Sequence, residues 1–92
     1  MAKVVKFAIT GKGDYYLPVG PNTTVSYGNA NNILYIGVAG NVIQVSHAAD
    51  TAGANVIGLS KAIYDVMKDS QLFEITWTPA QAVSNLEHDL LA

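Results

Sequence analysis

The chain has 92 residues, of which 13% are charged and 50% are hydrophobic, and a formal net charge of −2. This length is typical of one domain covering residues 1–92, and the hydrophobic content excludes wholesale disorder. All five basic residues are lysines, too few for a strongly basic nucleic-acid binder. The absence of cysteine excludes disulfides and thiolate metal sites.

The amino-terminal residues contain no apolar stretch of the length that a signal peptide needs. Nowhere does the sequence contain the run of about eighteen apolar residues that a membrane-spanning helix requires. We therefore expect a protein without a signal peptide, located inside the cell and without a membrane partner.

The sequence predicts five short strands in the first half of the chain, separated by turns rich in glycine and asparagine. The predicted strands cover residues 2–10, 15–19, 23–27, 33–38 and 42–47. In the first of them, Val5, Phe7 and Ile9 share one face. Pro18 has no amide hydrogen to donate, so the second strand is expected at a sheet edge or to end there. Short antiparallel strands at this spacing are typical of a small barrel.

The second half predicts two helices and one further strand. Apolar residues recur at helical spacing over residues 55–69, with Asn55 as the expected cap and Gly58 as the expected site of a close packing contact. Alternation over residues 72–77 predicts a strand. The sequence Thr-Pro-Ala-Gln that follows has the pattern of a capping box, which predicts a terminal helix over residues 79–91.

Charged residues are missing from one long segment, the thirty-five residues from Tyr15 to Ala49. Soluble surfaces normally carry interspersed charges that oppose association. One interpretation is that another subunit covers a face of this segment, which predicts a homo-oligomer. The alternative is that its many asparagine, threonine and serine side chains hydrate the surface of a monomer.

No group of residues predicts a catalytic or metal site. Ser46, His47 and Asp50 are the residue types of a hydrolase triad, but adjacent residues of a strand point to opposite faces. His47 together with residues 87–89 lacks the spacing of a known metal site. The glycines on either side of Lys12 are typical of a turn rather than of a phosphate-binding loop. We therefore expect a protein that is not an enzyme and holds no cofactor or metal.

Aromatic residues lie on or beside the predicted strands, and two uses of them remain open. Exposed tyrosines can stack on the bases of single-stranded nucleic acid. Tyrosines on short strands also pack in cores and subunit interfaces. The tyrosines concerned are Tyr15, Tyr16, Tyr27 and Tyr35.

The hairpin over residues 7–19, the strands over 33–38 and 42–47, and the late strand over 72–77 together resemble the Sm-like fold. The combination is similar to small Sm-like proteins attributed to cyanophages. The resemblance implies a small Sm-like or SH3-like β-barrel of about five to six short antiparallel strands, in a mainly β (α+β) chain with two helices. It also implies a cyclic homo-oligomer in which edge strands of neighbouring subunits pair, located in the host cytoplasm if the protein is encoded by a phage.

Two functional hypotheses follow. In the first, the protein is a ring-forming module that binds RNA or single-stranded nucleic acid. The residues predicted to make that contact are Lys12, Tyr15, Tyr16, Asn31, Asn32 and Asn41. In the second, it is a phage structural or virion accessory protein that acts only through homo-oligomeric assembly.

Overall fold

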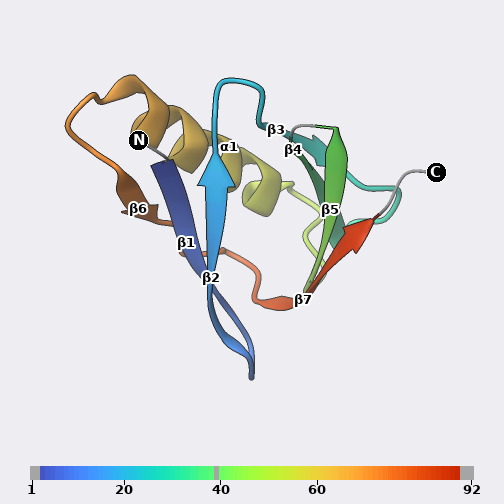
Figure 1. The fold of residues 1–92 in the computed structure, drawn as a ribbon. Coiled ribbons are helices and arrows are strands. Elements are labelled where there is room, and N and C mark those ends of the chain that lie inside the picture. The colour runs from blue at the N-terminus through green and yellow to red at the C-terminus, as the bar shows by residue number, and fades with distance from the viewer. Residues whose placement is uncertain (1–2, 39, 90–92) are drawn as a thin grey trace.

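Two β-sheets and one helix make up the fold (Figure 1). The structure is a computed structural model that describes residues 3–38 and 40–89. The first sheet contains β2 (Gly13–Val19), β1 (Lys3–Ile9) and β6 (Glu74–Thr76), in that order. The second sheet contains β3 (Thr24–Tyr27), β4 (Ile33–Val38), β5 (Asn41–His47) and β7 (Val83–Asp89). The helix α1 (Ala54–Lys68) connects β5 to β6.

The first sheet is built on the β1–β2 hairpin. Gly11 and Gly13 adopt φ angles of 75° and 95° in the tight turn, a region that glycine enters at little cost. β2 is an edge strand, as Pro18 predicted. β6 pairs with β1 in parallel, which differs from the expected all-antiparallel arrangement, because α1 carries the chain back to the start of β1.

The predicted closed barrel is wrong. β2 and β3 follow each other in the sequence but belong to different sheets, so the chain does not form one continuous meander. The sheets meet where the amide of Thr10 donates to the carbonyl of Val83 over 2.8 Å. Within the first sheet, the amide of Trp77 donates to the carbonyl of Lys6 and extends the pairing of β6 with β1 by one bond. The result is two sheets that are joined near Thr10 and Val83, with β2 and β3 unpaired to each other.

The predicted terminal helix over residues 79–91 is also wrong, because its described part forms β7. Val83 and Leu86 are three residues apart, which is helical spacing, yet both pack on the core. A bulge interrupts the pairing of β7 with Ser46 and His47, and an extra residue shifts the side-chain alternation by one. The final residues of the predicted helix lie outside the described part of the chain.

The core lies between the two sheets and one face of α1, which contacts β1, β3 and β6 (Figure 1). The ring of Trp77 meets Phe7 edge-on at 5.2 Å between centroids. A Cβ atom at Gly58 would lie 2.9 Å from Nε1 of Trp77, which confirms that this glycine marks a close packing contact. No helix in the described residues is long and apolar enough to cross a membrane.

Candidate functional site

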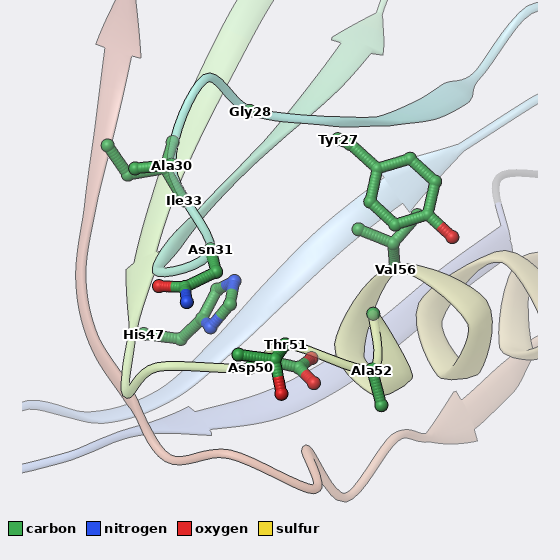
Figure 2. A pocket seen from close by; sticks show the side chains of 11 residues that line it. Tyr27, Gly28, Ala30, Asn31, Ile33, His47, Asp50, Thr51, Ala52 and Val56 are labelled. Atoms are coloured by element: carbon green, nitrogen blue, oxygen red, sulfur yellow. The ribbon is translucent and has the colours of Figure 1, made fainter.

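A cavity of about 320 Å³ opens where the β3–β4 loop, the end of β5 and the start of α1 come together (Figure 2). Its lining combines an aromatic ring and aliphatic side chains with a small number of polar groups. The residues that line it are Tyr27, Gly28, Ala30, Asn31, Ile33, His47, Asp50, Thr51, Ala52, Gly53 and Val56. The volume is near the lower end of the range of small-molecule sites.

The wall of the cavity is held in place by backbone hydrogen bonds from the β3–β4 loop. The carbonyl of Asn31 accepts from the amide of Asp50 at 2.8 Å, and the carbonyl of Asn32 accepts from the amide of His47 at 2.9 Å. Gly28 is required inside this loop because a Cβ atom there would lie 2.6 Å from the carbonyl oxygen of Ile33. The loop therefore fixes the end of β5 and the segment leading into α1.

His47 is the last residue of β5, and it is buried, with 6% of the residue exposed. Nδ1 lies 2.8 Å from the carbonyl oxygen of Ala48. Because a carbonyl oxygen can only accept, this contact places a proton on Nδ1, and in the neutral form of the ring Nε2 is then an acceptor. Nε2 is buried, and no atom of the described residues forms a hydrogen bond with it.

Asp50 caps α1 from four residues before Ala54, the first residue of the helix. Its Oδ1 accepts from the amide of Ala54 at 3.1 Å, and its Oδ2 accepts from the amide of Asn55 at 2.7 Å. The hydrogen bond from Asn55 lowers the pKa of Asp50, and the Ala54 bond acts in the same direction, against the opposing effect of burial. The carboxylate therefore stays ionised and satisfies two amides that the helix itself leaves free.

Replacing Asp50 with asparagine is expected to lower the melting temperature at neutral pH by several degrees, because the cap loses its charge. Since the pKa of Asp50 is lower in the folded state than in the unfolded state, the carboxylate stabilises the fold fully above the unfolded value. This contribution is lost as the pH falls through the folded value. The difference between the thermal melts of the two proteins should shrink once the pH falls below about 3.8, the ordinary pKa of the group, and vanish below the folded value. A constant difference down to pH 2 would contradict this account.

Ser46, His47 and Asp50 do not form a catalytic triad. Ser46 precedes His47 on β5, so the two side chains lie on opposite faces of the strand. The carboxylate of Asp50 is bonded to the first turn of α1. Nor does the structure assemble the candidate metal ligands, since His88 pairs with Ile43, about 13 Å along β5 from His47. In residues 3–38 and 40–89, no three His, Cys, Asp or Glu side chains form a metal-binding group.

The residues predicted to contact nucleic acid lie in three places. Three of them, Lys12, Tyr15 and Tyr16, belong to the β1–β2 hairpin. Asn31 and Asn32 belong to the β3–β4 loop beside the cavity. Asn41 begins β5, which places it about 20 Å from the end of that strand where the two loop asparagines bind. The structure thus does not bring all six onto one surface.

Two of the three amino-terminal lysines are engaged within the fold. Lys3 donates to the carbonyls of Val66 and Asp69 at 2.6 Å and 2.5 Å, which satisfies the end of α1. Lys6 lies 3.7 Å from the carboxylate of Asp14. Lys12 is exposed near the hairpin tip, with a single long contact of 3.5 Å to a backbone carbonyl. The hairpin therefore presents one largely unengaged lysine.

The tyrosines of the hairpin differ in exposure. Tyr15 is partly buried against Phe7, with ring centroids 5.6 Å apart, and burial raises the pKa of its hydroxyl. Tyr16 is 53% exposed, with the ammonium group of Lys6 5.8 Å from its ring centroid. Of the pair, Tyr16 is the one whose ring is available to a base or to another subunit.

Sequence reasoning missed the roles of Asn55 and Asp50. Asn55 is completely buried and is not a cap: it donates to the carbonyl of Gln81 at 2.8 Å and accepts from its amide at 3.0 Å. The available signal was an aspartate shortly before a predicted helix, the residue type that caps helix starts. In comparisons with protein-family models, curated proteins and solved structures, no match to this chain was found.

Proposed function

We propose that this protein is not an enzyme and acts by associating with further copies of itself through the free edge of β3. The observation that carries the proposal is that β3 is the outer strand of its sheet and contains neither a charged residue nor a proline. Such an edge presents unpaired backbone groups to solvent and, although it is only four residues long, carries neither the charge nor the proline that usually prevents pairing with another strand.

The other outer strands contain features that discourage pairing. β2 contains Pro18, which is exposed and cannot donate a hydrogen bond. β6 is only three residues long and contains the exposed Glu74. β7 contains the exposed Glu87. Charged residues and proline are two means by which soluble proteins protect sheet edges, and β3 is the outer strand of the described residues that contains neither.

The hydrogen-bond pattern identifies which backbone groups of β3 point outward. Gly28 donates to the carbonyl of Ile33, so this pair faces across the β3–β4 ladder. Bonded and non-bonded pairs alternate in an antiparallel ladder, which makes Ser26 a bonded residue and leaves the amides and carbonyls of Val25 and Tyr27 on the free side. Each β3 strand therefore offers two donors and two acceptors to a partner.

Two β3 edges are complementary about a two-fold axis at Ser26. In an antiparallel arrangement, Val25 of one copy faces Tyr27 of the other, and each such pair forms two hydrogen bonds. The two four-stranded sheets then join into one sheet, in which no charged residue lies on either pairing strand. A hollow of about 310 Å³ borders the start of β3, and its lining is also uncharged. The expected species has twice the 9.7 kDa mass of the chain.

Replacing Ser26 with lysine tests this arrangement, because the substitution places two ammonium groups opposite each other at the axis. The side chain of Ser26 is exposed, so the fold should tolerate the change. Light scattering at tens of micromolar protein is expected to give a dimer for the wild type and a monomer for Ser26→Lys. The control is Asn41→Lys, which adds the same charge at an exposed position on β5 and should remain dimeric.

The masses distinguish the remaining arrangements. The ring implied by the Sm-like resemblance requires β3 to pair with a different edge of the next subunit, and its mass exceeds that of a dimer. If the wild type forms a ring and Ser26→Lys disrupts it, β3 is still the pairing edge, but the pairing is not two-fold symmetric. A wild-type monomer at this concentration, or a dimer that Ser26→Lys leaves intact, contradicts the proposal.

Nucleic-acid binding is the second candidate function, and the exposed Lys12 and Tyr16 favour it. Both lie on the β1–β2 hairpin, which belongs to a different sheet from β3, so binding there is compatible with assembly. An electrophoretic shift of uridine-rich and mixed oligonucleotides at low salt tests it, with Lys12→Gln as the weakened variant. No shift at tens of micromolar protein leaves assembly as the function.

A further inference from the structure

A polar atom that the fold does not use lies beside the cavity, in one of its lining residues. Nε2 of His47 is the one buried side-chain nitrogen or oxygen without a hydrogen-bond partner in residues 3–38 and 40–89. Buried polar groups are almost always paired, because leaving one unpaired forfeits the hydrogen bond that water supplied in the unfolded chain. Such an unpaired atom beside a cavity points to a ligand that supplies the missing hydrogen bond.

The groups around the cavity determine the chemistry of that ligand. Nδ1 donates to Ala48, so Nε2 of the neutral ring can only accept. Asp50 is the only charged residue in the lining, which contains no lysine. Its negative charge exceeds the partial positive charge, about half a unit, at the start of α1. The cavity therefore favours donors and positive charge, and it disfavours anions.

An aromatic ring stands on the opposite side of the cavity. Tyr27 is 63% exposed, and Figure 2 shows its ring across the open space from His47. The ring lies over Gly53, where a Cβ atom would approach its Cε1 atom to 2.7 Å. Gly53 also has a φ angle of 71°, so two independent constraints require glycine beneath this ring. An exposed ring in a site with a carboxylate is a suitable neighbour for a cation.

We infer that this cavity binds a small organic cation with N–H donors, of the amine or amidinium class. One N–H group donates to Nε2 of His47, the positive charge lies near the carboxylate of Asp50, and the apolar part of the ligand contacts Tyr27. Nε2 itself is out of contact with solvent, so the donor reaches it when side chains of the β3–β4 loop move. Asn31 is exposed on that loop and lines the cavity, so its side chain is the one that we expect to move.

Benzamidine is the probe, with benzoate and benzamide as matched compounds that are anionic and neutral. In a titration followed by amide NMR, benzamidine is expected to shift the signals of Asn31, Thr51 and Gly53, with a dissociation constant in the millimolar range. The ring nitrogen signal of His47 Nε2 should shift with it, as expected for an acceptor that gains a donor. Benzoate should leave all of these signals unchanged, and benzamide should bind more weakly than benzamidine.

His47→Phe retains a buried ring but removes the acceptor, and it is expected to bind benzamidine at least about tenfold more weakly. The control is His88→Phe, which changes the other histidine, exposed on β7, and should bind like the wild type. If His47→Phe does not fold, the response of the Nε2 signal in the wild-type protein is sufficient to test whether benzamidine donates to His47. A cavity that holds only water gives no shift with any probe, and that result overturns the inference. Equal binding of benzoate, or no change in the Nε2 signal while benzamidine binds, also overturns it.

Discussion

Replacing Phe7 with alanine is expected to lower the free energy of unfolding by about 3–5 kcal/mol. The side chain is 1% exposed and lies at the centre of the first sheet. It contacts Trp77 edge-on and Tyr15 at a tilt, so the substitution removes aromatic contacts from both β2 and the segment after β6. Urea unfolding followed by tryptophan fluorescence measures the change, because Trp77 is the only tryptophan of the chain.

The matched control is the other phenylalanine. Phe73 is 42% exposed, and its one aromatic interaction in the described residues is with the ammonium group of Lys3, 5.6 Å from the ring centroid. Phe73→Ala is expected to cost less than about 1 kcal/mol. If the two substitutions destabilised the protein equally, Phe7 would not be the centre of the core.

Replacing Asn55 with alanine is expected to cost roughly 2–3 kcal/mol. The buried amide of Asn55 forms both hydrogen bonds to the backbone of Gln81, and no other residue replaces it once it is removed. Leaving an amide and a carbonyl unsatisfied costs about 1–3 kcal/mol for each fully buried group, and Gln81 is partly buried. Urea unfolding measures the loss directly.

Asn85→Ala is the comparison for Asn55→Ala. Asn85 lies on β7, and its side chain bonds only to Glu87 at the surface. Its replacement is expected to change stability by less than about 0.5 kcal/mol. An Asn55→Ala protein as stable as Asn85→Ala would show that the contact with Gln81 does not hold the segment before β7.

The local sequence pattern predicted the elements whose side-chain period is undisturbed. β1 follows strict alternation, and Val5, Phe7 and Ile9 are buried as expected. The apolar stripe of α1 likewise agrees with the observed helix to within one residue at each end. In both cases one face is apolar over several residues, so the local pattern and the tertiary environment favour the same conformation.

The errors arise where pairing between distant residues decides the structure. β7 forms because Val83 to Asp89 completes the second sheet beside β5, and the bulge there gives apolar residues the spacing of a helix. Barrel closure would have required β2 to pair with β3, which no local pattern specifies. The chain instead turns between them at Gly20 and leaves both edges free.

The candidate site shows the same limit. Its histidine and aspartate were visible in the sequence, but their roles depend on the tautomer set by Ala48 and on the start of α1. The lack of a partner for Nε2 depends on every side chain around it, so it could not be read from residue types. The asparagines of the β3–β4 loop form their contacts through backbone carbonyl groups. Every residue has such a group, so the residue type does not predict these contacts.

The uncharged segment from Tyr15 to Ala49 can now be assigned to particular strands. It covers β3, β4 and β5 completely and most of β2. Within it, β3 is the outer strand that lacks a proline. The assembly that we propose uses this one uncharged strand edge and does not require a whole uncharged surface.

Hydrogen exchange of the Val25 and Tyr27 amides tests this central claim most directly. In a monomer both amides point away from β4 into solvent and exchange rapidly, whereas pairing between two β3 edges buries them in hydrogen bonds. We expect both amides to become protected as the protein concentration rises, while Ser26 is protected at all concentrations. Rapid exchange of Val25 and Tyr27 at high concentration, with Ser26 protected, would show that β3 is not the edge through which the protein assembles.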